Sequence, residues 1–460
     1  MAEQCLHNIP TADMELVGDT FEDDTTDSDD EDKDHVGYYI PDQNIRHWVS
    51  AKYVNGRAGH VCVQYKDQVI VWGGIHRNPY RFLPPEELLL FCPASQTWSC
   101  VITTGDIPPG RSGTAAVLEG DFLFIACGVD QDIFNRSDRI WSLDLRFMVW
   151  KQLLPSGKPP IKSDKGCGWT FEGKIYVFGG FGLKPLGSEV LESDFTEIEE
   201  RTPEVSGWTN QLVCYDPATN TWSWPRTHGR PPLPRAGHAV SIVGSKVFIL
   251  GGRNGGSRLS DLHCLDMGSM VWENILPDSQ GGRGPAGRTW HSMVSLQGSD
   301  GPSLLVYGGF SNDNRVLRDC WKLRLTSENL TWEKSSFNLT QPRWWHSMVV
   351  VDHMIIVTGG LYSDSVHPHD CLIQHIKPQS LVNTCHQAIR LEMEFHLRSK
   401  SLQDLPRNLL TTVLMQKIDV NVHNYQDLRI LALSVHDTSI ARALLQRISH
   451  FCNKYNFKIN

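Results

Sequence analysis

The 460-residue sequence predicts an all-β fold built of six repeated units, preceded by a disordered acidic segment and followed by helices. Three observations support this prediction. A β-rich segment that ends in glycine recurs with a period of about 50 residues. A tryptophan follows these glycines one strand later. Beyond residue 377 the apolar side chains change from a two-residue to a helical period.

The glycine-ended segment defines the repeat. Its six copies are VIVWGG (69–74), FLFIACG (122–128), KIYVFGG (174–180), KVFILGG (246–252), LLVYGG (304–309) and IIVTGG (355–360). The last glycines are separated by 54, 52, 72, 57 and 51 residues, and a polar, Glu-rich insertion at 182–207 explains the longest interval. Glycine permits positive φ and close backbone approach at the end of a strand.

Two further elements recur in register with the glycines. A tryptophan follows in five copies, at Trp98, Trp150, Trp222, Trp272 and Trp332. Arg-x-x-His precedes them in four copies, at Arg57/His60, Arg235/His238, Arg288/His291 and Arg343/His346, whereas the second copy has Arg111 with Thr114 and the third has Lys165 near the equivalent position. Because the histidines recur, we assign them a structural role and no metal.

Four short strands per repeat, with a double glycine and a spaced tryptophan, resemble the kelch repeat, which is one blade of a β-propeller. Six copies imply a six-bladed kelch β-propeller over residues 46–376. The last copy lacks its tryptophan strand, and Arg46-His47-Trp48-Val49 offers one at the other end. We expect this N-terminal strand to complete the last blade and so to close the ring.

Charge is distributed unevenly along the chain. Residues 1–45 contain 14 Asp or Glu and one Lys, so the net charge of −9 leaves +4 for the rest. The acidic segment repels itself and buries little apolar area, so we expect it to be disordered. An excess of +4 is too small to indicate a nucleic-acid partner, and no aromatic-basic RNA-binding motif is present.

Several protein classes are disfavoured by composition. No apolar run approaches the ~20 residues of a membrane span, and the N-terminus does not read as a secretory signal. The 12 cysteines form no CxxC pair, which argues against a disulfide framework and a zinc ribbon. We therefore expect reduced thiols in the nucleus and/or cytoplasm, with no membrane partner and no cofactor.

The helical part begins with two short motifs. Leu381, Cys385 and Ile389 share one helix face behind Ser380 as the N-cap, a pattern that resembles the BC-box through which substrate receptors bind elongin C. Leu405-Pro406 opens a segment that resembles the cullin-2 box. We interpret 377–410 as BC-box and cullin-2-box helices, with packing on the propeller as the alternative. Residues 411–460 form a helical extension to which we assign no role.

The loops contain candidate ligand-binding residues. Arg253 and Arg258 lie in one short loop after the fourth glycine pair, and guanidinium groups bind carboxylate or phosphate in a planar, bidentate way. Aromatic and polar candidates around them are Thr289, Trp290, Trp345, Trp208, Phe181 and Lys165. An aromatic depression with cationic donors suits a peptide end with one carboxylate. Solvated arginines and inter-blade tryptophans remain the alternative.

The span 46–410 resembles the kelch domain-containing protein 1/2 family. The segments that carry the resemblance are GGRNGGSRLSDLHCL (251–265), GRTWHS (287–292), PRWWHS (342–347), DKGCGW (164–169), SGWTN (206–210) and PQSLVNTC (378–385). The resemblance implies a non-catalytic substrate receptor of a cullin-2 ubiquitin ligase. Its implied partners are elongin C with elongin B, cullin-2 with its RING subunit, and substrate C-terminal tails, typically ending in diglycine.

The resemblance also implies roles for single residues. Arg253 and Arg258 correspond to the family's carboxylate-binding arginines and Thr289 to its hydroxyl donor, while Lys165 lies at the rim. The pocket walls correspond to Trp208, Trp290 and Trp345. Phe181 stands where the family has Tyr, and Thr289 where it has Ser, so the preferred C-terminal end can differ from diglycine.

Two other classes of function stay open from sequence. A kelch scaffold without degradative function would use the same propeller to bind a protein partner. A metal-dependent kelch-fold enzyme would need a ligand cluster, and His367-Pro368-His369-Asp370 is the densest one in the sequence.

Overall fold

The structure is a computed structural model that describes residues 46–49 and 56–376, with gaps at 78–79, 94–95, 133–134, 185–189, 199–204, 279–283, 327–329, 338, 340 and 363–370. The predicted disordered segment 1–45, the helices of 377–410 and the extension 411–460 lie outside the described residues, and so do Leu381, Cys385, Ile389, Leu405 and Pro406. Within the described part, no helix has the length and apolarity to cross a bilayer.

The described residues form ten sheets, and six of these are the main sheets, one for each glycine-ended repeat. The first sheet contains β2 (Val61–Tyr65), β3 (Gln68–Trp72), β6 (Glu87–Cys92) and β7 (Thr97–Ile102). The second contains β10 (Ala115–Glu119), β11 (Phe122–Ala126), β14 (Ile140–Asp144) and β15 (Val149–Leu153). The third contains β18 (Cys167–Phe171), β19 (Lys174–Lys184), β21 (Val205–Asp216) and β22 (Thr221–Ser223). The fourth sheet contains β24 (Ala239–Val243), β25 (Lys246–Leu250), β28 (Leu262–Asp266) and β29 (Val271–Leu276). The fifth contains β31 (Ser292–Gly298), β32 (Gly301–Tyr307), β34 (Cys320–Arg324) and β35 (Trp332–Lys334). The sixth contains β36 (Ser347–Val351), β37 (Met354–Thr358) and β38 (Leu372–His375).

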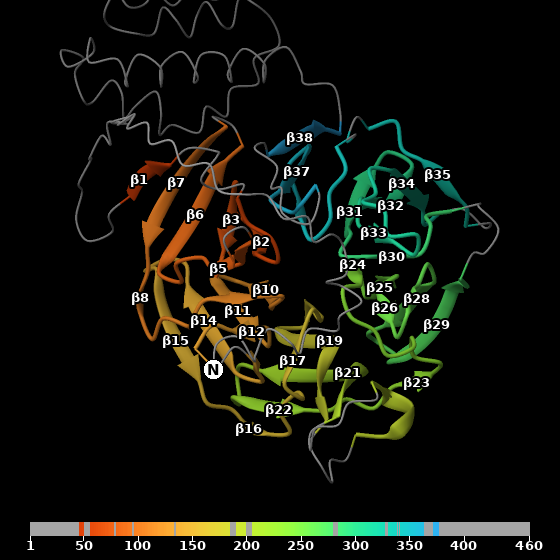
Figure 1. Ribbon diagram of the computed structural model, residues 1–460, viewed down its shortest axis with the longest axis horizontal. Coiled ribbons are helices and arrows are strands. Elements are labelled where there is room, and N and C mark those ends of the chain that lie inside the picture. Colours follow the sequence, from red (N-terminus) through yellow and green to blue (C-terminus); the bar gives the residue numbers. More distant parts are fainter. Residues whose placement is uncertain are drawn as a thin grey trace, which may run out of the picture. The chain divides into compact units, whose positions relative to one another are not determined.

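The six sheets are the blades of a β-propeller, as the repeats predict. The first strand of each blade contacts the first strand of the next, from β2 through β10, β18, β24 and β31 to β36, and β36 returns to β2. Figure 1 shows β2, β10 and β24 near the axis and β7, β15 and β29 at the periphery. The contact between β36 and β2 closes the ring at its centre.

Apolar side chains fill the space between neighbouring blades. Trp72 of the first blade packs on Trp150 of the second, with ring centroids 5.2 Å apart, in one buried cluster. Another buried cluster joins Val349 and Ile356 of the last blade to Trp98 of the first. The recurring tryptophan therefore packs between blades, as predicted, and it also seals the junction of the last blade with the first.

The N-terminal strand lies on a different blade from the one we expected. β1 (Arg46–Val49) pairs antiparallel with β7, from Arg46 opposite Val101 to Val49 opposite Trp98. It therefore extends the outer edge of the first blade, and the prediction that it completes the last blade is wrong.

The other outer edges explain this placement. A two-residue strand from the preceding linker pairs with β15, β22 and β29 in turn, namely β8 (Thr104–Gly105), β16 (Ser156–Gly157) and β23 (His228–Gly229). No earlier blade supplies such a linker to β7, so the chain that precedes the first blade covers that edge.

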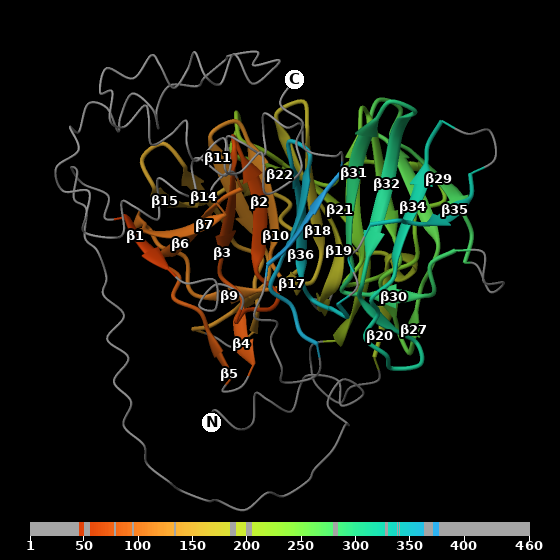
Figure 2. The same ribbon diagram turned by 90° about the horizontal axis from the view of Figure 1, so that it is seen from above.

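Short strands extend the blades at one end. They include β4 (Ile75–Arg77) with β5 (Tyr80–Phe82), β9 (Arg111–Ser112) with β12 (Val129–Asp130) and β13 (Asn135–Arg136), β17 (Ser163–Asp164) on β19, β20 (Phe195–Glu197) on β21, β26 (Arg253–Asn254) with β27 (Ser257–Arg258), and β30 (Arg288–Thr289) with β33 (Phe310–Ser311). Figure 2 shows β4, β5, β20 and β27 at the same end of the blades. We call this the loop end.

The arginines of the Arg-x-x-His repeat are buried structural residues. Arg57, Arg111, Arg235, Arg288 and Arg343 each donate from Nη1 to a backbone carbonyl at the glycine motif, on Gly73, Cys127, Gly251, Gly308 and Gly359 respectively. The third blade has Ser163 at the position that these arginines occupy in the other blades. The pairing of Ser163 opposite Gly182 fixes this register. Lys165 lies two residues further along, and this shift brings it to the axis.

Candidate functional site

Six backbone segments meet around the propeller axis at the loop end. Their amides and carbonyls form a closed ring of hydrogen bonds of 2.7–3.2 Å, in which each N–H donates to the carbonyl of the next member. In order, the ring runs Gly59, Trp345, Trp290, Gly237, Lys165, Gly113 and back to Gly59. We call it the axial ring.

Three side chains project from the axial ring, and they are three of the predicted site residues. All six members have positive φ, between 54° and 64°, and three of them are glycine, which adopts this conformation without strain. Lys165, Trp290 and Trp345 are the exceptions. A bulky side chain at positive φ is strained, and such strain is concentrated at ligand sites.

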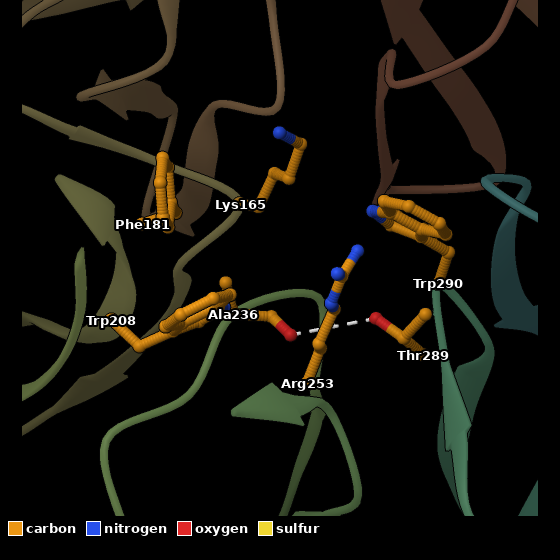
Figure 3. A pocket seen from close by; sticks show the side chains of 7 residues that line it. All are labelled: Lys165, Phe181, Trp208, Ala236, Arg253, Thr289 and Trp290. Atoms are coloured by element: carbon orange, nitrogen blue, oxygen red, sulfur yellow. Dashed lines mark hydrogen bonds between the residues drawn. The ribbon is translucent and has the colours of Figure 1, made fainter. Parts of the chain in front are cut away.

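A small pocket opens beside the axial ring, between the third, fourth and fifth blades. It is lined by Lys165, Phe181, Trp208, Ala236, Arg253, Thr289 and Trp290. Figure 3 shows Phe181 and Trp208 on one side, with the guanidinium of Arg253 between Lys165 and Trp290. The structure thus gathers six of the eight predicted substrate-binding residues in one lining. Its volume is about 30 Å³, which is room for about two water molecules.

Two aromatic rings form one wall of the pocket. Phe181 at the end of β19 pairs opposite Trp208 at the start of β21, and their ring centroids lie 5.2 Å apart in an edge-to-face arrangement. Only 4% of Phe181 and 6% of Trp208 is exposed. The guanidinium of Arg136 lies 4.4 Å from the centre of the Phe181 ring and holds it from behind.

The two predicted arginines lie opposite one another in a hairpin, Arg253–Arg258, which we call the arginine hairpin. Arg253 Nε donates to the carbonyl of Gly255 over 2.9 Å, and its guanidinium lies 5.9 Å from the Trp208 ring. The guanidinium of Arg258 is 4.8 Å from the centre of the Phe310 ring, and the residue is 7% exposed. Arg258 therefore lies behind the pocket lining that Arg253 enters.

Lys165 is held by a buried carboxylate. Its Nζ lies 2.9 Å from Oδ2 of Asp164, and Nε of Arg136 lies 3.0 Å from Oδ1 of the same side chain. Burial acts to raise the pKa of the Asp164 carboxyl, but Lys165 and Arg136 outweigh it and hold that pKa below its ordinary value. Two cations share one anion here, so the group keeps one positive charge beside the pocket.

Two donors belong to adjacent residues of the fifth blade. The Thr289 hydroxyl donates to the carbonyls of Gly237 at 3.2 Å and of Ala236 at 3.4 Å, the latter drawn in Figure 3. A hydroxyl has one proton, so Thr289 must leave these carbonyls to donate to a ligand. The indole Nε1 of Trp290 is buried and has no hydrogen-bond acceptor among the described residues.

A second cavity of about 180 Å³ follows the axis beneath the ring and shares Lys165 and Trp290 with the pocket. Trp345 lines this axial cavity and not the pocket, with its ring 5.9 Å from that of Trp290. The repeated histidines His60, His238, His291 and His346 also line it. Burial, followed by the neighbouring arginines, lowers the pKa of His238 and of His346 to about 3, so both rings are neutral.

The four repeated histidines belong to no cluster of metal-ligand side chains among the described residues. No group of three or more His, Cys, Asp or Glu side chains arranged to hold a metal occurs in residues 46–49 and 56–376 outside the gaps. The cluster His367, His369 and Asp370 lies outside the described residues.

Sequence reasoning missed Ala236, Asp164 and Arg136. Ala236 follows Arg235 just as Thr289 follows Arg288, so the register of the Arg-x-x-His repeat contained the signal. Asp164 directly precedes Lys165, so the sequence placed a carboxylate beside a predicted site lysine. Arg136 comes from the second blade, and nothing in the sequence indicates that it reaches Phe181.

Comparison with known proteins identifies the propeller as a kelch domain. Residues 59–300, more than half of the chain, match the family model described as the KLHDC2/KLHL20/DRC7 Kelch-repeats domain. Kelch domain-containing protein 2 of Bos taurus is 32% identical over 375 residues, which cover 78% of this chain and 89% of the relative.

The chain belongs to the kelch domain-containing protein 1/2 family. Kelch domain-containing protein 1 of Mus musculus is 30% identical over 386 residues, covering 80% of this chain and 92% of the relative. The human kelch domain-containing protein 1 is 30% identical over 381 residues, covering 78% and 89%. Membership in the kelch domain-containing protein 1/2 family supports a substrate-recognition role for the propeller.

Proposed function

We propose that this chain is the non-catalytic substrate receptor of a cullin-2/elongin ubiquitin ligase, and that its propeller binds the C-terminal tails of substrate proteins. The observation that supports the proposal most strongly is the pocket at the loop end. Arg253 and Lys165 enter it beside the aromatic wall of Phe181 and Trp208, and Arg258 lies behind it.

A carboxylate is the ligand group that this chemistry favours. An anion loses its hydration in so small a space, and the loss is offset only by charged or strongly polar partners. A guanidinium offers two parallel donors in the plane of a carboxylate, and the Trp290 indole offers one more. A free C-terminus is the carboxylate that every protein tail carries.

The size of the pocket favours small terminal residues. A volume of about 30 Å³ has room for little more than a carboxylate group, and a bulky terminal side chain would meet the Trp208 and Trp290 rings that line it. Glycine at the substrate end fits this restriction. Specificity then depends as much on what the walls exclude as on what the arginines bind.

The test of ligand class uses one fluorescent peptide in two forms, ending in Gly-Gly with a free carboxylate or with an amide. We expect the wild-type full-length protein to bind the free acid at least about 30-fold more tightly, because the amide removes the charge that the arginines pair with. Equal affinity for the two peptides would contradict the proposal.

The ligase partners are proposed from the motifs after the propeller. Leu381 and Cys385 would insert into a groove of elongin C, with elongin B bound to it, and Leu405 and Pro406 would contact cullin-2 and its RING subunit. We propose that the receptor acts in the nucleus and/or cytoplasm, because its 12 cysteines form no CxxC pair and indicate no disulfide framework, a usage typical of a reducing compartment.

A copurification experiment separates this proposal from a scaffold without degradative function. We expect the wild-type chain to retain elongin C and cullin-2, and Leu381→Ser with Cys385→Ser to lose both while still binding the peptide. Retention of both partners by the double variant would contradict the assignment of these residues.

A further inference from the structure

The insertion at 182–207 supports the aromatic wall of the pocket without lining the pocket itself. Its strand β20 pairs with the start of β21, with Phe195 opposite Thr209, Thr196 opposite Trp208 and Glu197 opposite Gly207. Phe181 pairs with Trp208 from the other side. Trp208 therefore lies on β21, the middle strand between β19 and β20, and the insertion supplies β20.

β20 is seated closely on its neighbour. A Cβ added at Gly207 would lie 2.2 Å from the Thr196 carbonyl oxygen and 2.5 Å from the Phe195 ring, so only glycine permits this approach. Ile198, just after β20, donates its N–H to the carbonyl of Ser206 and packs on the cluster that contains Phe181 and Trp208.

The same strand contacts the arginine hairpin. Asn254 Nδ2 donates to the Thr196 hydroxyl over 3.3 Å. On its other side, the hairpin is held by Asn312 of the fifth blade, which accepts from the Arg258 N–H at 2.7 Å and donates to the Arg258 carbonyl at 2.8 Å. The hairpin is therefore held between the insertion of the third blade and a loop of the fifth.

We propose that the insertion fixes the arginine hairpin in its binding conformation and that Thr196 is the positioning residue through which it acts. The hairpin has Gly255 and Gly256 at its tip, so a hairpin released from its contacts gains conformational freedom. Ordering such a loop costs affinity, and ordering it before the ligand arrives removes that cost. The inference rests on the proposed function only in its choice of a carboxylate as the ligand.

The direct test measures amide hydrogen exchange of residues 253–258 in the full-length protein without ligand. Thr196→Val removes the hydroxyl and keeps the shape, and we expect it to speed exchange of the hairpin at least about threefold. Thr196→Ser keeps the hydroxyl and should restore slow exchange. Thr219→Val is the matched control, because it removes an exposed Thr219–Thr221 hydrogen bond at the opposite end of β21. Unchanged hairpin exchange in Thr196→Val would overturn the inference.

The second test measures affinity for the free-acid Gly-Gly peptide. We expect Thr196→Val to lower it roughly 2- to 10-fold, the range of one lost hydrogen bond, and Thr196→Ser to retain it. In an Arg253→Ala/Arg258→Ala background the same substitution should have no further effect, because Thr196 acts through the two arginines of the arginine hairpin. A full additional loss in that background would contradict the inference.

A backbone variant tests the seating of β20 separately. Gly207→Ala forces the strands apart, and we expect a larger loss of peptide affinity than from Thr196→Val. Gly298→Ala is its control, since a Cβ there meets nothing closer than 3.5 Å. If the wild-type protein fails to bind the peptide, the proposed function fails, whereas hydrogen exchange still decides whether the insertion holds the hairpin.

Discussion

The backbone N–H of Gly59 donates a hydrogen bond to the carbonyl of Trp345 over 3.2 Å and so joins the first blade to the last. The Trp345 indole covers the Gly59 backbone, with ring atoms 2.8–3.0 Å from the place of a Cβ. The last blade has three strands within the described residues. The axial ring, and the apolar cluster that contains Trp98, therefore join this blade to the first one.

Gly59→Ala tests this junction. The variant adds a side chain at a φ of +64° and a clash with Trp345, whereas Gly244→Ala adds one at a φ of +60° with nothing within 4 Å. We expect Gly244→Ala to lower the free energy of unfolding by about 1 kcal/mol and Gly59→Ala by about 1–3 kcal/mol more. Urea denaturation of both variants measures the difference. Equal losses would show that the contact with Trp345 contributes nothing.

The sequence was sufficient for the repeated features of the fold. Glycine pairs, tryptophans and buried arginines recur in register, because every blade must satisfy the same packing at the axis and between blades. The pairing of β1 could not be obtained this way, since an edge strand with suitable length fits either edge and the choice depends on the reach of the preceding chain. Lys165 at the axis was also hidden, because Lys replaces the glycine that marks that position in the first, second and fourth blades.

The candidate site was predicted in outline and not in detail. Arg253 directly follows the fourth glycine pair and Arg258 comes five residues later, so their place at the loop end came from the repeat. Arg253 lines the pocket and Arg258 lies behind it. This difference depends on the twist of the six-residue arginine hairpin, which the sequence does not specify. The contact of Thr196 with Asn254 joins the insertion of the third blade to the arginine hairpin of the fourth, and no local pattern indicates it.

Acid sensitivity follows from the buried histidines. Burial, then Arg235 or Arg343, lowers the pKa of His238 and His346 from 6.5 to about 3 in the folded chain. Below pH 6.5 the unfolded chain binds protons that the folded chain rejects, so the free energy of unfolding falls as pH falls. Each ring contributes about 1.4 kcal/mol per pH unit once the unfolded histidine is protonated.

Urea denaturation between pH 7 and 5 measures this slope, above the range in which carboxylates titrate. We expect His346→Gln to reduce the slope of the free energy of unfolding against pH by the contribution of about one proton. His228 is exposed, and we expect His228→Gln to leave the slope unchanged. A wild-type stability that is constant over this range would contradict the account of the axial histidines.

Phe181 offers a gain-of-affinity prediction. The ring lines the pocket, and the guanidinium of Arg136 lies over its face, 4.4 Å from the ring centre. Phe181→Tyr adds a hydroxyl donor, and we expect affinity for the free-acid peptide to rise about fivefold, the effect of one hydrogen bond of about 1 kcal/mol. Affinity for the amidated peptide should change less. Unchanged or weaker binding of the free acid would mean that the added hydroxyl does not reach the ligand.

The most direct test of the central claim is the affinity of Arg253→Ala/Arg258→Ala for the free-acid Gly-Gly peptide. The control is Arg315→Ala, which removes an arginine whose side chain is 78% exposed, in the loop after β33. We predict that the double variant binds at least about 30-fold more weakly than wild type, since a buried charge pair is broken, and that Arg315→Ala stays within about twofold. Wild-type affinity in the double variant would contradict carboxylate recognition by the arginine hairpin.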